Sequence, residues 1–220
     1  MGLYDRNYIQ NSAESTYEQV RLDESSLGVF IKQTYQLFAA SLLAASAGAY
    51  VGIGMASTIA SWYWGLVILE FVFLFGLYAA KRKAGLNIIL LFGFTFLSGL
   101  TLAPLLSNIL GLKGGGSIVA NAFILTTVAF GGLSVFAMNT KRDFSGMGKM
   151  LFITLIVIVV AGLINIFFHS PILQLAIASI SSILFSAFIL YDTQNIIKGA
   201  YETPIEGAIA LYLDFLNLFV

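Results

Sequence analysis

The sequence has no cysteine, a single histidine and three prolines, and only 10% of its 220 residues are charged. Without cysteine, the chain can form no disulfide framework. The low charge content argues against a soluble globular protein, in which about a quarter of the residues are charged. The first thirty residues carry both charge signs and no apolar core, so we expect no signal peptide. Nucleotide, metal-cluster and nucleic-acid-binding motifs are also absent, so we expect no cofactor and no nucleic-acid partner.

Hydrophobic residues are abundant instead and make up 59% of the sequence. Several apolar runs reach about 20 residues, the length that crosses about 30 Å of hydrocarbon. We therefore expect an all-α integral membrane protein, with a polar N-terminal tail at residues 1–33 and a transmembrane domain at residues 34–220. The expected spans lie at about 34–56, 59–80, 86–107, 117–138, 149–168, 171–198 and 204–220. The last should be the central helix, wrapped by the other six, because its apolar residues go all the way round.

The basic residues indicate the orientation in the membrane. Ten of the eleven lysines and arginines fall in the tail or in connections after even-numbered spans, and only Lys113 falls on the other side. The positive-inside rule then places the N-terminus in the cytoplasm. The basic group Lys81-Arg82-Lys83 should anchor this topology and can touch anionic lipid headgroups.

Acidic residues inside three of the spans are the candidate functional residues. Asp192 and Asp214 lie in the last two spans, and each is followed three residues later by an asparagine, Asn195 or Asn217. The third acid is Glu70, near the middle of the second span. Buried ionisable residues are costly in a membrane and usually functional. Glu70 can be an extra ion ligand, or a protonated acid bonded to a neighbouring helix.

Turn signals between the last two spans place the two aspartates at similar depth. Gly199 is suited to end the first of these helices, while Thr203, Pro204 and Glu206 have the pattern of a capping box that starts the second. At about 1.5 Å per residue, Asp192 lies about 10 Å before its helix end, and Asp214 about 15 Å after its helix start. The alternative is that each aspartate only caps or bonds locally.

Two carboxylates that meet in an apolar helix pair form a possible pH switch. At about 4 Å they repel by roughly 4 kcal/mol at an effective dielectric of 20, so the pair should share one proton and titrate as a unit. Calcium prefers six to eight oxygen ligands, so two aspartates and two amides would bind it only weakly. Weak binding suits a leak.

Three segments resemble the signature of the Bax inhibitor-1 family, also called the transmembrane Bax inhibitor motif family. They are Gly99-Leu-Thr-Leu-Ala-Pro104, Ile189-Leu-Tyr-Asp192 and Ala208-Ile-Ala-Leu-Tyr-Leu-Asp214-Phe-Leu-Asn-Leu-Phe219. The resemblance implies seven helices with the last one central, and a pH-sensitive calcium leak whose sensor is an aspartate pair, here Asp192 and Asp214. The short tail favours a bacterial inner-membrane member of this family over an organelle one. The resemblance also implies an arginine at the end of the second helix that binds the first aspartate; Ala80 aligns there, so Lys81 or Arg82 must replace it or the latch is absent.

Three functions fit these observations. The first is a cation leak, mainly for calcium, gated by protonation of Asp192 and Asp214. The second is a non-conducting regulator that binds other membrane proteins, such as a membrane protease or a cell-death factor. The third, an intramembrane aspartyl protease, is disfavoured because Leu211-Tyr-Leu-Asp214 replaces the Gly-x-Gly-Asp of such enzymes, so we expect no enzymatic activity.

Overall fold

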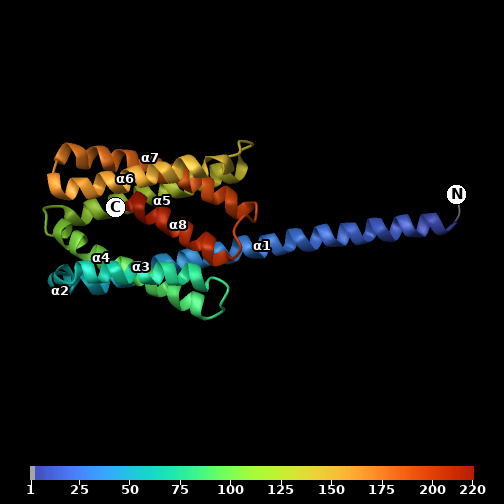
Figure 1. The fold of residues 1–220 in the computed structure, drawn as a ribbon, viewed down its shortest axis with the longest axis horizontal. Helices are drawn as coiled ribbons and strands as arrows, with labels where there is room; N and C mark the ends of the chain where they lie inside the picture. Colours follow the sequence, from blue (N-terminus) through green and yellow to red (C-terminus); the bar gives the residue numbers. More distant parts are fainter. Residues whose placement is uncertain (1–2) are drawn as a thin grey trace.

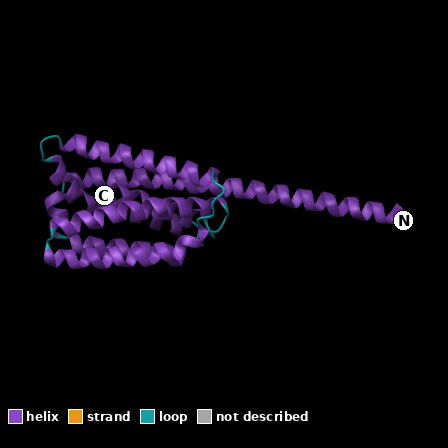
Figure 2. Ribbon diagram, turned by 90° about the horizontal axis from the view of Figure 1, so that it is seen from above, coloured by secondary structure: helices purple, strands orange, loops and turns teal. Residues whose placement is uncertain are grey.

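The computed structural model describes the backbone of residues 3–220 and the side chains from Ser25 onward. This part of the chain is almost entirely helical and contains no strand. Its elements are α1 (Leu3–Ile53), α2 (Ala56–Ser61), α3 (Tyr63–Ala80), α4 (Leu86–Leu110), α5 (Gly115–Asn139), the 3-10 turn η1 (Ser145–Met147), α6 (Gly148–Phe168), α7 (Pro171–Ile197) and α8 (Pro204–Phe219). The helices form a bundle from which the N-terminal part of α1 projects (Figures 1 and 2).

Six helical stretches of the described chain are long and apolar enough to cross a membrane. They are Ser25–Ile53, Tyr63–Ala80, Leu86–Leu110, Gly115–Asn139, Ser145–Phe168 and Pro171–Ile197. The expectation of seven helices is not confirmed, because the described residues form eight α-helices. A break at Trp62 separates the short α2 from α3 within the expected second span. The last helix, α8, has 16 residues and is about 24 Å long at 1.5 Å per residue, less than the hydrocarbon thickness.

Although it is short, α8 lies among the other helices and carries much of the buried core. Ala208, Leu211 and Tyr212 are completely buried. Its main neighbours are α7 and α1, and it also contacts α4 and α5. In contrast, α3 packs mainly on α4 and α6 mainly on α7, and α6 buries only Leu151 and Asn165. The outer faces of these helices therefore expose apolar side chains that suit contact with lipid.

Glycines allow α1 and α4 to pack closely, and these two helices share the most extensive contact in the bundle. A Cβ atom on Gly99 of α4 would overlap the carbonyl oxygen of Ala45, and one on Gly48 of α1 would overlap that of Phe96. Small residues at helix contacts let the backbones approach where a larger side chain would hold them apart. The Gly99 segment that carries the family resemblance is thus a packing element.

The connection between α7 and α8 has the geometry that its sequence predicts. Gly199 takes a left-handed conformation with φ of 65°, and the amide of Ala200 donates to the carbonyl of Asn195 at the end of α7. The Thr203 side chain accepts from the Glu206 amide, while the Glu206 carboxylate accepts from the Thr203 amide. The predicted capping box is therefore confirmed, and this short loop brings α7 and α8 side by side.

Candidate functional site

Asp192 of α7 and Asp214 of α8 face each other inside the bundle. Their exposed fractions are 5% and 3%, and their carboxyl groups lie within hydrogen-bonding reach of each other. The Oδ2 atom of Asp214 accepts no hydrogen bond from any described group. Buried carboxyl oxygens normally have partners, so this arrangement leaves room for a proton shared by the two acids or for a bound cation.

Tyr201, in the loop between α7 and α8, completes this aspartate pair. Its hydroxyl donates a hydrogen bond of 2.6 Å to Oδ1 of Asp192. Asn195 lies within hydrogen-bonding reach of both Asp192 and Tyr201, as its spacing from Asp192 predicted. Burial, followed by the nearby charge of Asp192, raises the pKa of Tyr201 above its usual value. The hydroxyl therefore keeps its proton and can donate it in the hydrogen bond to Asp192. Sequence reasoning missed Tyr201, because only the folded loop turns its side chain back onto α7.

Groups from other elements reach the pair only weakly. Tyr78 of α3 is close enough to Asp192 for an electrostatic interaction between the two. In the part of the chain whose side chains are described, no ion pair joins either aspartate to a lysine or arginine. The negative charge of the pair is therefore balanced by donors and, in the protonated state, by the proton itself.

The basic residues that follow α3 bind acids at the start of α8. The Nζ atom of Lys81 lies 2.6 Å from Oε1 of Glu206 and 3.1 Å from Oε2 of Glu202, and Arg82 lies 2.7 Å from the same Glu202 oxygen. Hydrogen bonds from Arg82 and Lys81 lower the pKa of Glu202, and those to Glu206 and Glu202 raise the pKa of Lys81. The expected latch from Lys81 or Arg82 to Asp192 is therefore absent, because these two side chains form ion pairs with Glu202 and Glu206 instead.

A second loop is fixed close to Asp192. The side chain of Gln194 donates to the carbonyl of Arg142 and accepts from the amide of Phe144, both at 2.7 Å, which holds the connection between α5 and α6 against α7. The Nζ atom of Lys198 lies 2.6 Å from the carboxylate of Asp143 in this connection. Hydrogen bonds from Lys198 and then Ser145 hold the pKa of Asp143 well below its usual range.

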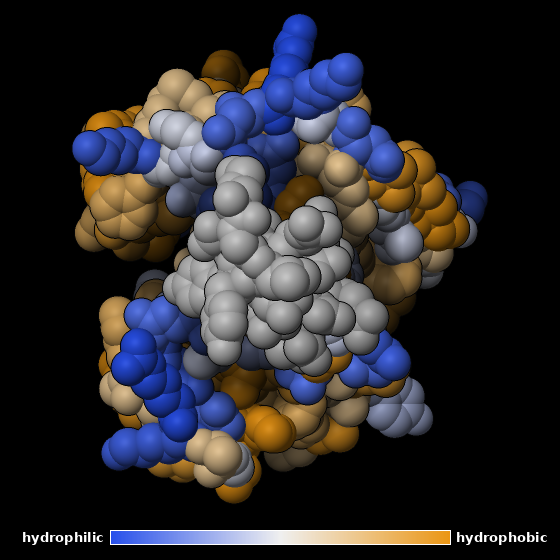
Figure 3. All heavy atoms as spheres, turned by 90° about the vertical axis from the view of Figure 1, so that its right-hand side faces the viewer, coloured by the Kyte–Doolittle hydropathy of each residue, from blue (hydrophilic) through white to orange (hydrophobic). Residues whose placement is uncertain are grey.

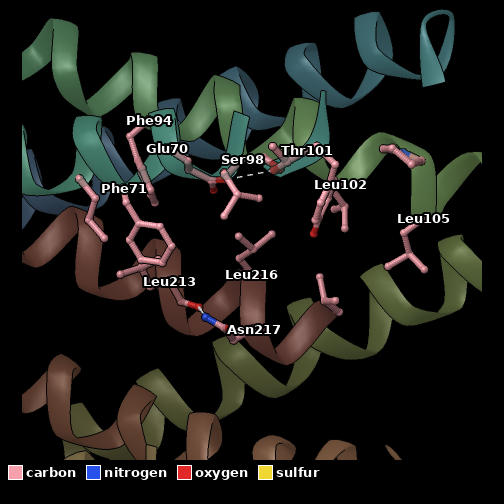
Figure 4. A pocket seen from close by; sticks show the side chains of 15 residues that line it. Glu70, Phe71, Phe94, Ser98, Thr101, Leu102, Leu105, Leu213, Leu216 and Asn217 are labelled. Atoms are coloured by element: carbon pink, nitrogen blue, oxygen red, sulfur yellow. Dashed lines mark hydrogen bonds between the residues drawn. The ribbon is translucent and has the colours of Figure 1, made fainter. Parts of the chain in front are cut away.

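Glu70 lies apart from the aspartate pair and lines a cavity of about 430 Å³ between α3, α4 and α8 (Figure 4). Its carboxylate accepts a hydrogen bond of 3.1 Å from the hydroxyl of Thr101. Ser98 also lines the cavity, and its hydroxyl bonds to that of Tyr212 on α8. Most other lining residues are apolar, so Glu70 is the acid of an otherwise weakly polar cavity.

Asn217 belongs to this cavity and not to the aspartate pair. Its side chain donates to the carbonyl of Leu213 at 2.7 Å and points toward the same space as Glu70 (Figure 4). Three residues advance about 300° around a helix, so the side chains of Asp214 and Asn217 point about 60° apart. The rotation of α8 about its axis turns Asp214 toward α7 and Asn217 toward α3 and α4. The structure thus does not bring the Asn217 side chain to the aspartate pair, and its support of Asp214 stays a prediction.

The donor set limits what metal the site can hold. Among the described residues, no three His, Cys, Asp or Glu side chains gather where they could hold a metal ion. Asp192, Asp214, Asn195 and Tyr201 offer fewer oxygens than the six to eight that calcium prefers. This composition suits brief contact with a passing cation better than tight storage.

Together, the helices and the buried acids define a polytopic α-helical membrane protein with an acidic site inside the bundle. Residues 27–220 match the family described as inhibitor of apoptosis-promoting Bax1, and the chain belongs to this Bax inhibitor family. The resemblance found in the sequence motifs is confirmed over nearly the whole chain.

Relatives of this chain come from bacteria and a virus. An uncharacterised protein of Campylobacter jejuni is 62% identical over 100% of this chain and 95% of its own length. An uncharacterised membrane protein of Vibrio cholerae is 38% identical over 86% of this chain and 84% of its own. The Golgi anti-apoptotic protein of vaccinia virus is 36% identical over 67% of this chain and 60% of its own.

Proposed function

We propose that this protein is a cation leak, mainly for calcium, whose opening depends on the protonation of Asp192 and Asp214. The observation that carries this proposal is the contact between these two buried carboxyl groups on neighbouring helices, with one oxygen of Asp214 left without a partner among the described residues. A site of this kind changes charge inside the bundle when a proton leaves or arrives.

The charge of the pair acts on the packing of α7 against α8. One shared proton forms a hydrogen bond between the acids and draws the two helices together. Its loss leaves two carboxylates that repel by roughly 4 kcal/mol at about 4 Å and an effective dielectric of 20, or that bind a cation instead. A second proton leaves both groups neutral. Each state therefore favours a different separation of the helices.

The Glu70 cavity supplies an approach to the pair from the other side of α8. Leu213, which lines the cavity, directly precedes Asp214, so the cavity and the pair lie at similar depth. We propose that a cation is attracted first by Glu70 and then passes α8 to reach the aspartates. In this proposal α8 is the central helix of the fold, which agrees with its burial among α1, α4, α5 and α7.

The basic residues support an orientation in the membrane. Lys81, Arg82, Arg142 and Lys198 all lie at the end of the bundle from which α1 projects, where hydrophilic side chains gather around the rim (Figure 3). Lys113 lies in the connection between α4 and α5 at the other end. By the positive-inside rule we propose that this N-terminal end faces the cytoplasm, in a bacterial inner membrane.

The test is calcium flux into liposomes that contain the purified protein, measured from about pH 5 to about pH 8. The matched control is the Asp192→Asn/Asp214→Asn protein, which keeps side-chain shape but cannot titrate. We expect flux in the wild type that changes with pH, and none of this dependence in the control. Absence of flux from the wild type at every pH would refute the leak.

A second candidate function is a non-conducting regulator that binds other membrane proteins, including a membrane protease or a cell-death factor. The vaccinia virus relative, which is named a Golgi anti-apoptotic protein, favours it. Recovery of a specific membrane-protein partner, together with absence of flux, would support this function over the leak.

We also propose that the protein is not an enzyme. An aspartyl protease must admit an extended peptide beside its aspartates, yet Leu211 is completely buried one helical turn before Asp214. Incubation with a helical membrane peptide should therefore give no cleavage product in either the wild type or the double aspartate variant.

A further inference from the structure

The loop between α7 and α8 covers the aspartate pair at the N-terminal end of the bundle. Only six residues, 198–203, separate the two helices. Within them, Tyr201 packs its ring against the buried core and places its hydroxyl 2.6 Å from Asp192. The hydroxyl therefore occupies Oδ1 of Asp192, the oxygen that lies on the side of this loop.

Charged groups hold the same loop from outside. Glu202, the neighbour of Tyr201, binds both Lys81 and Arg82, and Lys81 also binds Glu206 at the start of α8. Lys81 and Arg82 directly follow α3, so these ion pairs tie the loop to α3 across a long distance in the sequence. Any motion of α3 away from α8 would break the ion pairs and release the loop beside Tyr201.

We propose that this loop is the gate at that end of the pathway, with Tyr201 as the residue that closes it and Lys81 as the latch that holds it closed. The inference rests on the proposed function, because it assigns a gate to the same aspartate site. It assigns Tyr201 a positioning role, since its hydroxyl orients and covers Asp192. The latch acts on the loop and not on the aspartate.

The first test uses access to the site and does not require transport. The chain has no cysteine, so a single cysteine in place of Asn195, which is 8% exposed beside Asp192 and Tyr201, is the one thiol that can react; all variants are compared in this same background. Its modification by a water-soluble methanethiosulfonate should become about tenfold faster when Lys81→Gln or Tyr201→Phe is added, the factor expected for loss of one charge-assisted hydrogen bond.

Two substitutions serve as matched controls. Lys83→Gln removes a positive charge two residues from Lys81, and Lys83 makes no ion pair with a described residue. Tyr191→Phe removes a tyrosine hydroxyl beside Asp192 in sequence, but that hydroxyl packs against Gly148. Neither control should change the modification rate. Equal rates in the Lys81→Gln, Tyr201→Phe and control backgrounds would overturn the gate.

The second test is calcium flux at constant pH from liposomes without the added cysteine. Lys81→Gln and Tyr201→Phe should each raise flux by up to about tenfold, and Lys83→Gln and Tyr191→Phe should not. In a Lys81→Cys/Glu202→Cys protein, a short bis-methanethiosulfonate should lower flux, and reduction should restore it. If access rises but no variant conducts calcium, the gate stands and the leak falls; if the wild type conducts and neither test responds, the gate falls alone.

Discussion

The two acidic regions inside the bundle differ in what surrounds them. Asp192 and Asp214 are buried against each other beneath Tyr201, and their loop is fixed by ion pairs. Glu70 is alone in a cavity of about 430 Å³, with Thr101 as its hydrogen-bond donor. A carboxyl group that faces another carboxyl responds to protons through their mutual repulsion, whereas a single carboxyl mainly attracts cations. In the proposed function, the pair therefore senses pH and Glu70 attracts cations.

The largest expected effect is loss of pH dependence when either aspartate is replaced. A leak controlled by one proton changes by up to about tenfold per pH unit. Asp192→Asn or Asp214→Asn leaves a single carboxyl without a charged partner, so the coupled titration disappears. Liposome flux from about pH 5 to about pH 8 should become nearly constant. If both variants keep the wild-type pH profile, the aspartate pair is not the pH sensor.

Replacement of Glu70 should change the amount of flux more than its response to pH. Glu70→Gln keeps the hydrogen bond with Thr101 but removes the negative charge that would attract a cation into the cavity. We expect calcium flux to fall by up to about tenfold at low ionic strength, and by less in high salt because the field is screened. A flat pH profile in this variant, with normal profiles in both aspartate variants, would identify Glu70 as the sensor.

Removal of the Thr101 hydroxyl should have a smaller effect at the same cavity. Thr101→Val keeps the shape of the side chain but leaves the carboxyl of Glu70 without its donor. One membrane hydrogen bond contributes about 0.6 kcal/mol on average, so flux should change by about threefold. Thr127→Val, which removes an exposed hydroxyl bonded only within α5, is the control and should leave flux unchanged. An effect as large as that of Glu70→Gln would mean that Thr101 itself contacts the ion.

The smallest effect is expected at an acid outside the membrane. Lys198 and Ser145 lower the pKa of Asp143, so this ion pair favours the folded state above the ordinary aspartate pKa of about 4. Its contribution should decrease as the pH falls below about 4. Because Asp143 is exposed, Asp143→Asn should lower Tm by no more than about 2 °C near neutral pH, with little difference from wild type in acid.

Thermal unfolding in detergent at several pH values measures this difference, and flux gives the control. A change in the pH profile of flux upon Asp143→Asn would show that the connection between α5 and α6, held by Gln194, takes part in sensing. The assignment of pH sensing to acids inside the bundle alone would then be wrong.

The sequence alone determined the class of protein, the family and the local ends of the last two helices. Long apolar runs with few charges have no stable alternative to membrane helices, since backbone groups must be bonded within each helix in lipid. The capping box at Thr203 and the turn at Gly199 depend only on neighbouring residues, so they were predictable. The matched depths of Asp192 and Asp214 also follow from counting residues along two helices joined by a short loop.

The tertiary structure decided which side chains meet. The rotation of α8 about its axis turns Asp214 toward Asp192 but Asn217 toward Glu70, and no local pattern fixes that rotation. The path of a six-residue loop brings the Tyr201 hydroxyl onto Asp192. The packing of α3 beside α8 brings Lys81 within ion-pair distance of Glu202 and Glu206. These contacts join residues from different helices, so they depend on how the whole bundle packs and not on any single segment.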